Sequence, residues 1–227
     1  HRNGQQLLNV IDEILDISKI EAGRLEVEVL EFDLLGLLTD IRTLLTIKSI
    51  EKNLKLEFSL ETSIPEKIQS DPTRVRQILT NIISNAIKFT DKGPVLVKIS
   101  RIDNPDSTRG LLEITVQDTG VGIKEDQIDR LFQPFAQVDS STTRLFGGTG
   151  LGLALSQKLA SALGGNVTLE ETQPDQGSTF KIQLSVAPVE DCEWVDTFKD
   201  IDQELEFSTN KSQREKNASL NGIKVLL

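Results

Sequence analysis

The sequence predicts an α+β fold, a two-layer α/β sandwich in which a mostly antiparallel sheet is covered by helices on one face. Three observations support this prediction. Apolar residues recur at helical spacing in four segments, they alternate with polar residues in several segments between and after these, and the last two alternating segments are separated by the turn sequence Pro-Asp-Gln-Gly. With 227 residues, 37% of them apolar, the chain can bury one sizeable core.

Two helices are expected in the first quarter of the chain. Residues 3–22 carry apolar side chains on a 4-3-4 spacing, and this helix is expected to end at Gly23. Asp33 is an N-cap candidate for a second helix over 34 to about 52, because its carboxylate can accept hydrogen bonds from the first turn. Each helix has an apolar face and therefore needs a partner to cover it.

The elements that follow mix strands and helices. Residues 54–60, LKLEFSL, alternate between apolar and polar types, as is typical of a half-buried strand. Asp71 and Pro72 predict a helix start, because a carboxylate caps the first turn and proline suits the first helical position. The other expected elements are a turn at 63–65, the end of that helix near 89, strands at 95–100 and 111–118, a short helix at 125–132, a helix at 153–163, and a closing hairpin of strands at 167–171 and 178–186.

The end of the chain has a different composition. Residues 190–206 hold eight acidic residues and one lysine. Their apolar side chains keep a 4-3-4 helical spacing: Trp194, Phe198, Ile201 and Leu205. We therefore expect an acidic amphipathic helix that packs on the preceding domain or on a second chain, followed by a polar linker that extends to 222. Residues 223–227, IKVLL, predict the start of a buried strand of a further domain.

Composition excludes several function classes. A formal net charge of -10 argues against a nucleic-acid partner, because the phosphate backbone would be repelled. The single cysteine, Cys192, excludes an intrachain disulfide and fits a reducing compartment. No apolar run reaches the roughly 18 residues of a membrane span. We therefore expect a cytoplasmic location with no membrane contact by this part of the protein, although an intact protein could be anchored upstream.

The helix that begins at Pro72 has a polar face with a chemical pattern. Arg74, Asn81, Asn85 and Lys88 line up on the side opposite its apolar residues. Two stacked carboxamides supply hard oxygen ligands, and a lysine one turn later supplies a cation, a combination that suits Mg²⁺ and phosphate. The alternative is an ordinary solvated helix face.

A second candidate site is the sequence Asp-Thr-Gly-Val-Gly at 118–122, where a carboxylate ends an apolar strand. A buried carboxylate there could accept a hydrogen bond from an exocyclic amine such as that of adenine. The two glycines would let the backbone approach the ring. The alternative is an ordinary turn at the end of a strand.

The third candidate is the glycine-rich stretch GGTGLGL at 147–153. It lacks the Gly-Lys-Ser/Thr of a Walker A loop, and its glycines miss the G-x-G-x-x-G spacing of dinucleotide-binding folds. It does lie at the start of the helix over 153–163, where free N–H groups and the positive helix end can hold an anion. The stretch before it, 136–146, is rich in Ser and Thr and is predicted to be a mobile lid. The alternative for the glycines is a simple hinge.

Taken in order, the motifs resemble a known family. They are N-x-x-x-N-x-x-K at 81–88, D-x-G-x-G at 118–122, F-x-x-F at 132–135, GGTGLGL at 147–153 and GSTF at 177–180. This series resembles the ATP-binding catalytic domain of sensor histidine kinases, over about 30–187. The amino-acid sequence around the motifs is similar to that of the hybrid kinases of that group. The resemblance implies the Bergerat-type ATP-binding fold, shared with type II topoisomerases and mismatch-repair ATPases, with a lid over the nucleotide.

On the phosphate side, the resemblance implies that Asn85 is the Mg²⁺ ligand, that Asn81 supports it and that Lys88 contacts phosphate. Arg144, within the lid, would reach toward the γ-phosphate. The residues expected to wrap the phosphates are Gly148, Thr149, Gly150, Leu151 and Gly152.

On the base side, the resemblance implies that Asp118 accepts a hydrogen bond from the adenine amine. Phe89 would lie against the adenine pocket, and Thr179 would close it. The remaining residues would shape the pocket wall or anchor the lid: Gly120, Gly122, Phe132 and Phe135.

One position separates the branches of this superfamily. Hydrolytic members resemble one another in carrying a glutamate four residues before the metal-binding asparagine, where this chain has Asn81. An amide cannot take a proton from water at neutral pH, so hydrolysis by general base catalysis is disfavoured. Phosphoryl transfer to a neutral imidazole needs only positioning and charge neutralisation from this domain.

The ends of the chain add partners to this prediction. Residues 7–25 resemble the end of the second helix of the dimerisation and phosphotransfer hairpin, so residues 1–25 are assigned to that hairpin. The one histidine, His1, is followed by Arg-Asn-Gly and not by an acceptor box, so the phosphorylated histidine is expected elsewhere in the protein. Residues 223–227 resemble the first strand of a receiver domain.

The predicted function is therefore transfer of the γ-phosphate of Mg-ATP to a hairpin histidine, in an intact protein that is a homodimer and relays phosphate to a receiver domain. Two alternatives stay open from the sequence. One is a serine kinase of the same superfamily that acts on a partner protein. The other is a regulatory module that holds ATP without transferring its phosphate.

Overall fold

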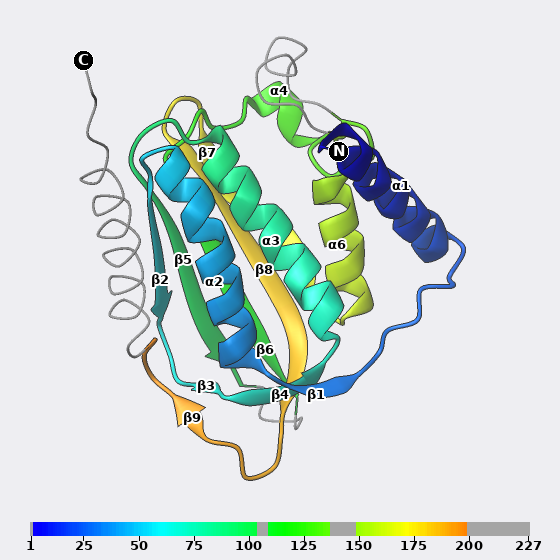
Figure 1. The fold of residues 1–227 in the computed structure, drawn as a ribbon, viewed down its shortest axis with the longest axis vertical. Coiled ribbons are helices and arrows are strands. Elements are labelled where there is room, and N and C mark those ends of the chain that lie inside the picture. The colour runs from blue at the N-terminus through cyan, green and yellow to red at the C-terminus, as the bar shows by residue number, and fades with distance from the viewer. Residues whose placement is uncertain (1, 104–108, 137–148, 199–227) are drawn as a thin grey trace, which may run out of the picture. The chain divides into compact units, whose positions relative to one another are not determined.

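The structure, a computed structural model, describes residues 2–103, 109–136 and 149–198, which build one mixed sheet and a layer of helices (Figure 1). The strand order is β1-β4-β8-β6-β5-β2, with β7 paired to β8. The strands are β1 (Leu30–Asp33), β2 (Lys55–Leu60), β4 (Lys67–Ser70), β5 (Pro94–Ile102), β6 (Gly110–Gln117), β7 (Asn166–Gln173) and β8 (Gly177–Pro188). Every pairing in this sheet is antiparallel except that of β2 with β5, which confirms the predicted mostly antiparallel sheet.

The middle of the sheet, β6 beside β8, supplies much of the core. Residues alternate along both strands, so Leu112 lies opposite Leu184 and Ile114 lies opposite Ile182, all fully buried. Burying such a side chain contributes about 1.5–3 kcal/mol each to folding. The alternation therefore turns one face of the sheet toward the helices.

Three helices lie side by side over that face (Figure 1): α2 (Leu34–Glu51), α3 (Pro72–Phe89) and α6 (Gly152–Ala162). Helix α3 packs between α2 and α6, and α1 (Arg2–Glu21) packs against α6. Among the described helices, none combines the length and the apolar character that crossing a bilayer requires.

The starts of α2 and α3 follow the predicted capping chemistry. The Asp33 carboxylate accepts a hydrogen bond from Gly36 N. One oxygen of Asp71, Oδ1, accepts from the N–H groups of residues 73 and 74, and its other oxygen accepts from Glu28 N at 3.1 Å, in the connection between α1 and β1. These carboxylates accept hydrogen bonds from first-turn N–H groups that have no partner within the helix. Helices α2 and α3 therefore begin at the residues that the sequence predicts.

The structure corrects the predicted turn at 63–65 and, in its described part, the helix predicted at 193–206. Ile64–Pro65 is a short strand, β3, and it pairs with a second short strand, β9 (Trp194–Val195). The Arg101 guanidinium also lies over the Trp194 ring, with its Cζ atom 5.0 Å from the ring centroid. Long-range strand pairing and this cation–π contact override the local helical pattern. Residues 199–206 lie outside the described residues.

The short helix predicted at 125–132 is also corrected. It is one turn long, α4 (Glu125–Ile128). The chain continues through turns in which several N–H groups bond the carbonyl three residues back, such as Leu131 N to Ile128 O. This tighter pattern cannot propagate as an α-helix. Strands β1 and β4 are further elements that the sequence pattern did not predict.

Candidate functional site

The polar face of α3 carries two of the predicted residues in a hydrogen-bonded chain. Asn81 Nδ2 donates to Ser156 Oγ of α6 at 2.8 Å, and Asn85 Nδ2 donates to Asn81 Oδ1 at 3.4 Å. Both asparagines are half-buried. Because the Asn85 amide nitrogen points along the helix to Asn81, the carbonyl oxygen on the same group points away from it.

This arrangement fits a Mg²⁺ ion held mainly by phosphate. Mg²⁺ commonly keeps several waters and takes only one or two protein ligands beside substrate phosphates. In the described parts of the chain, no three His, Cys, Asp or Glu side chains come together as a dedicated metal site. A single amide oxygen from Asn85 is therefore consistent with an ion that arrives with a nucleotide.

Lys88 and Phe89 lie together at the end of α3. The Lys88 ammonium is 4.7 Å from the centroid of the Phe89 ring. Burial lowers the pKa of Lys88 from its ordinary value of 10.5. The Phe89 ring is 37% exposed, so an aromatic surface and a cation are presented side by side.

Asp118 is a buried carboxyl group, 7% exposed, just beyond the end of β6. Its Oδ1 accepts from Gly120 N at 2.8 Å and from Ser178 N at 3.3 Å, and Asp118 N donates to the Ser178 carbonyl. Burial raises the pKa of Asp118, against the smaller opposing effect of these two backbone hydrogen bonds. The backbone thus holds one carboxylate oxygen and leaves Oδ2 outside that pair of bonds.

Two glycines join the loop after Asp118 to its neighbours. A Cβ on Gly120 would collide with the Phe89 carbonyl, which accepts a hydrogen bond from Val121 N at 3.3 Å. Gly122 has a positive φ of 64°, and a Cβ there would collide with the Gln173 carbonyl. The loop can therefore lie directly against the end of α3 and against the β7–β8 hairpin.

A cavity of about 640 Å³ opens beside Asp118. Thr179 lines it together with Ser178 of β8, and apolar surface comes from Ile128 of α4 and Leu169 of β7. The structure thus brings Asp118 and Thr179, two of the residues predicted for the base side, to one cavity. Asn85 and Lys88 do not line this cavity.

The glycine-rich stretch is described from Thr149 onward. Thr149 Oγ1 donates to Glu13 Oε2 of α1 at 2.9 Å and accepts from Leu151 N at 3.2 Å. Leu151 is the N-cap residue of α6, and its side chain makes no capping hydrogen bond. The first-turn N–H groups of α6 can therefore bind an anion. A Cβ on Gly152 would collide with the Asn81 carboxamide, so this glycine lets α6 approach α3 closely.

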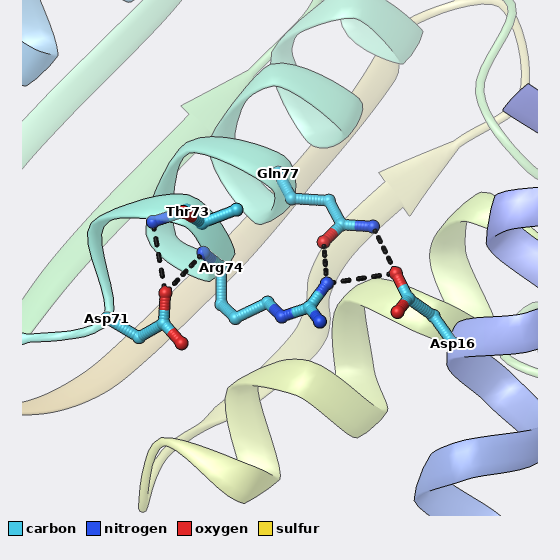
Figure 2. A network of polar contacts seen from close by, with 5 residues as sticks. All are labelled: Asp16, Asp71, Thr73, Arg74 and Gln77. Carbon is cyan, nitrogen blue, oxygen red and sulfur yellow. Dashed lines mark hydrogen bonds and ion pairs between the residues drawn. The ribbon is translucent and has the colours of Figure 1, made fainter. Parts of the chain in front are cut away.

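A polar network holds α1 against the start of α3 (Figure 2). Asp16 Oδ2 accepts from Arg74 Nη1 at 2.9 Å and from Gln77 Nε2 at 3.1 Å, and Arg74 also donates to Gln77 Oε1 at 2.9 Å. The Arg74 and Asp16 side chains are only 19% and 13% exposed. The sequence places Arg74 on the candidate phosphate-binding face. In the structure, the Arg74 guanidinium instead pairs with Asp16 of α1.

The structure describes some of the remaining predicted residues and not others. Phe132 is half-buried, whereas Phe135 is 65% exposed and has a positive φ of 64°. Gly150 also has a positive φ, 70°, and lies against the backbone of Phe135 and Ala136. Arg144 and Gly148 lie outside the described residues.

Sequence reasoning missed several residues that support the site. Ser156 holds Asn81, and Ser178 holds Asp118 through its backbone N–H. Thr172 and Ser178 share a hydrogen bond at 2.9 Å across the β7–β8 hairpin. Ser178 stands directly before Thr179 in the quoted GSTF motif, and that position could have indicated it. Ser156 has no comparable signal, because a serine on a helix is usually solvated.

Comparison with known proteins identifies relatives. The family model described as "Histidine kinase-, DNA gyrase B-, and HSP90-like ATPase" matches residues 70–188. The chain is 40% identical over 210 residues to hybrid signal transduction histidine kinase F of Dictyostelium discoideum, covering 92% of this chain and 18% of that protein. It is 41% identical over 187 residues to the signal transduction histidine-protein kinase BarA of Escherichia coli K12, covering 82% of this chain and 20% of that protein.

Solved structures give the same picture. The crystal structure of full-length ShkA in complex with AMPPNP superposes with a TM-score of 0.69 at 31% identity, covering 83% of this chain and 37% of that one. The chain thus spans about one fifth of the length of the two curated relatives, 18% and 20%. The two-layer fold, the ordered motifs and the match over 70–188 agree. The chain therefore belongs to the family of histidine kinase-, DNA gyrase B- and HSP90-like ATPases.

Proposed function

We propose that this chain binds Mg-ATP and transfers the γ-phosphate to a histidine on the phosphotransfer hairpin of the same protein. The observation that carries the proposal is Asp118, a carboxyl group buried to 7% exposure beside a cavity that Thr179 also lines. Its Oδ2 would accept a hydrogen bond from the adenine amine, while the backbone holds Oδ1. Phe89 is not part of the lining of that cavity; it would contribute aromatic surface from the end of α3, next to the loop that follows Asp118.

The phosphate end of the proposed site lies between α3 and the start of α6. Asn85 would bind Mg²⁺ through its carbonyl oxygen, Lys88 would contact phosphate, and the α6 N-terminus would face the negative charge. Mg²⁺, when bound with the nucleotide, supplies neutralisation of phosphate charge. The proposed roles of Gly148 and Arg144 concern positions outside the described residues.

Phosphoryl transfer is favoured over hydrolysis by the surroundings of Asn81. Its amide nitrogen donates to Ser156 and its amide oxygen accepts from Asn85, so it serves as a structural link between helices. A neutral amide cannot remove a proton from water. A neutral imidazole nitrogen brings its own lone pair to phosphorus, and ADP leaves as the bond from phosphorus to the bridging oxygen breaks.

We further propose that the intact protein is a cytoplasmic signalling kinase that dimerises through its hairpin and passes the phosphate to a receiver domain. The support is the similarity to a hybrid signal transduction histidine kinase at 40% identity and to a second signal transduction histidine-protein kinase at 41% identity. The acceptor is proposed to be a histidine other than His1, because Arg-Asn-Gly follows His1 in place of an acceptor box.

The test is incubation with γ-labelled Mg-ATP, with and without a separately produced hairpin of the same protein. We expect label on the hairpin and none on the chain alone. A hairpin with its histidine replaced by glutamine should stay unlabelled. The label should be lost in acid, as expected for a phosphorus–nitrogen bond; acid-stable label would indicate a serine kinase, and ATP binding without any transfer would indicate a regulatory module.

A further inference from the structure

The side chain of Lys52 closes the end of α3 from a neighbouring helix. Its ammonium donates to the carbonyl oxygens of Ile87 at 3.0 Å, Lys88 at 2.7 Å and Thr90 at 2.8 Å. A lysine ammonium has three donors and no acceptor, so these three bonds use its full donor capacity. Lys52 is the C-cap residue of α2, and the contact therefore joins the ends of two packed helices.

Each carbonyl in the last turn of α3 has a partner as a result. The Ala86 carbonyl accepts from Thr90 N and from Thr90 Oγ1, and the Phe89 carbonyl accepts from Val121 N. Lys52 satisfies the other three carbonyls of residues 86–90. The final carbonyls of a helix have no partner within the helix, and a cation is favourable at that end. Lys52 thus supplies both the donors and the charge that this end requires.

The position of Lys52 is itself fixed by local structure. Its backbone N–H donates to the carbonyls of Ser49 and Ile50 at the end of α2, and Asn53 follows in the left-handed region with φ 56°. Asparagine tolerates that conformation better than most residues. The chain therefore turns sharply after Lys52 into β2, which holds the base of the lysine side chain beside α3.

The last turn of α3 carries the groups assigned to the nucleotide. Lys88 and Phe89 both belong to it, and the Lys88 ammonium lies 4.7 Å from the Phe89 ring centroid. The Phe89 carbonyl also bonds the loop that follows Asp118, through Val121 N. We propose that Lys52 is a positioning residue for the nucleotide site, which acts by fixing this turn and with it Lys88 and Phe89. The inference rests on the proposed function.

Replacing Lys52 by methionine removes the three donors while keeping a similar side-chain length. The carbonyl of Thr90, a fully buried residue, would then lose its partner, and the turn would no longer be held in one position. We expect the Kd for Mg-ATP to rise about tenfold. Lys48→Met is the matched control, because Lys48 lies one turn earlier on α2, is exposed, and loses the same charge; its Kd should stay within about twofold of the parent.

The decisive measurement is a double-mutant cycle by calorimetry on the 227-residue chain, below the unfolding onset of the least stable variant. If Lys52 acts through the last turn of α3, its tenfold effect should shrink to less than about threefold when Lys88 is already methionine. Lys52→Gln, which keeps two donors, should give an intermediate rise in Kd. It also serves in the cycle if Lys52→Met does not fold.

Two outcomes would overturn the positioning role. One is a lower melting temperature of Lys52→Met with an unchanged Kd, which would reduce Lys52 to a structural cap. The other is an effect of Lys52→Met that stays about tenfold in the Lys88→Met background. Absence of Mg-ATP binding by the unsubstituted chain would instead contradict the proposed function itself, and the inference with it.

Discussion

The base end and the phosphate end of the candidate site are built differently. At the base end, Asp118 is held by a backbone N–H group of the adjoining loop at 2.8 Å and by one of the sheet at 3.3 Å. At the phosphate end, Thr149 bonds the side chain of Glu13, which belongs to α1 and not to the sheet. Backbone contacts within a sheet vary little, whereas a contact between side chains of two elements depends on how those elements pack.

The difference suggests a division of labour between the two ends. A preformed base pocket costs little reorganisation when the nucleotide binds. At the phosphate end, the Thr149 hydroxyl donates to the Glu13 carboxylate. This hydrogen bond must break before the hydroxyl can donate to a phosphate. Base recognition should therefore be insensitive to α1, and phosphate recognition should depend on it. Four measurements test this division of labour.

The largest effect is expected for Asp118→Asn. The amide oxygen can keep the hydrogen bonds from Gly120 N and Ser178 N, but the second carboxylate oxygen becomes a donor group facing the adenine amine. Adenosine and ATP should both bind about 100-fold more weakly, as a lost charged acceptor implies. Calorimetry checks this, with exposed Asp175→Asn as the charge-matched control. A loss confined to ATP would place Asp118 at the phosphate end instead.

A smaller effect, confined to the phosphate end, is expected for Asn85→Ala. The Kd for Mg-ATP should rise about tenfold or more, because the variant lacks the proposed metal ligand. Adenosine should bind as in the parent, and so should ATP in the presence of a chelator. Binding isotherms with and without Mg²⁺ separate these cases, and equal weakening in both would argue against a metal role.

A modest gain is expected for Glu13→Gln. Removing the carboxylate weakens the hold on Thr149 and removes a negative charge near the proposed phosphates. Mg-ATP should bind about threefold more tightly at low salt, and adenosine should be unaffected. Asp12→Asn, an exposed change on the same helix, removes the same charge and should leave the Kd unchanged. Weaker binding by Glu13→Gln would mean that α1 supports the loop and does not compete for it.

The smallest effect is a change in the pH dependence of stability. Because burial raises the folded-state pKa of Asp118 above 3.8, the group contributes stability below that value and loses it as pH rises through the folded pKa. Asp118→Asn does not titrate there. The free energy of unfolding of the variant, minus that of the parent, should therefore rise across this window and then level. Urea titrations from about pH 4 to about pH 7 measure the difference, and a falling difference would mean that hydrogen bonding outweighs burial.

The elements that sequence could predict are those with local signals. Asp33 and Asp71 mark the starts of α2 and α3 because capping acts within three residues. The β7–β8 hairpin follows from alternation and a turn sequence. The pairing of β3 with β9 could not be predicted, because its partners lie far apart in the chain and the local pattern around Trp194 favours a helix.

The same distinction applies to the site. Asp118 and Thr179 were predicted from motifs, and the structure brings them to one cavity. The contact of Lys52 with the end of α3 spans 35 to 38 residues, and that of Asp16 with Arg74 spans 58. Charged residues on helices are usually solvated, so nothing in the sequence marks these as partners. Only the packing of α1, α2 and α3 reveals them.

The two-sided use of Asp71 has a mechanical consequence. One carboxylate oxygen holds the first turn of α3, and the other holds Glu28 N in the connection that leaves α1. Tension along that connection would therefore act on the same rigid group that anchors α3, the helix that carries Asn85 and Lys88. Asp71 thus ties the connection after α1 to the start of the helix that carries the proposed ligand residues.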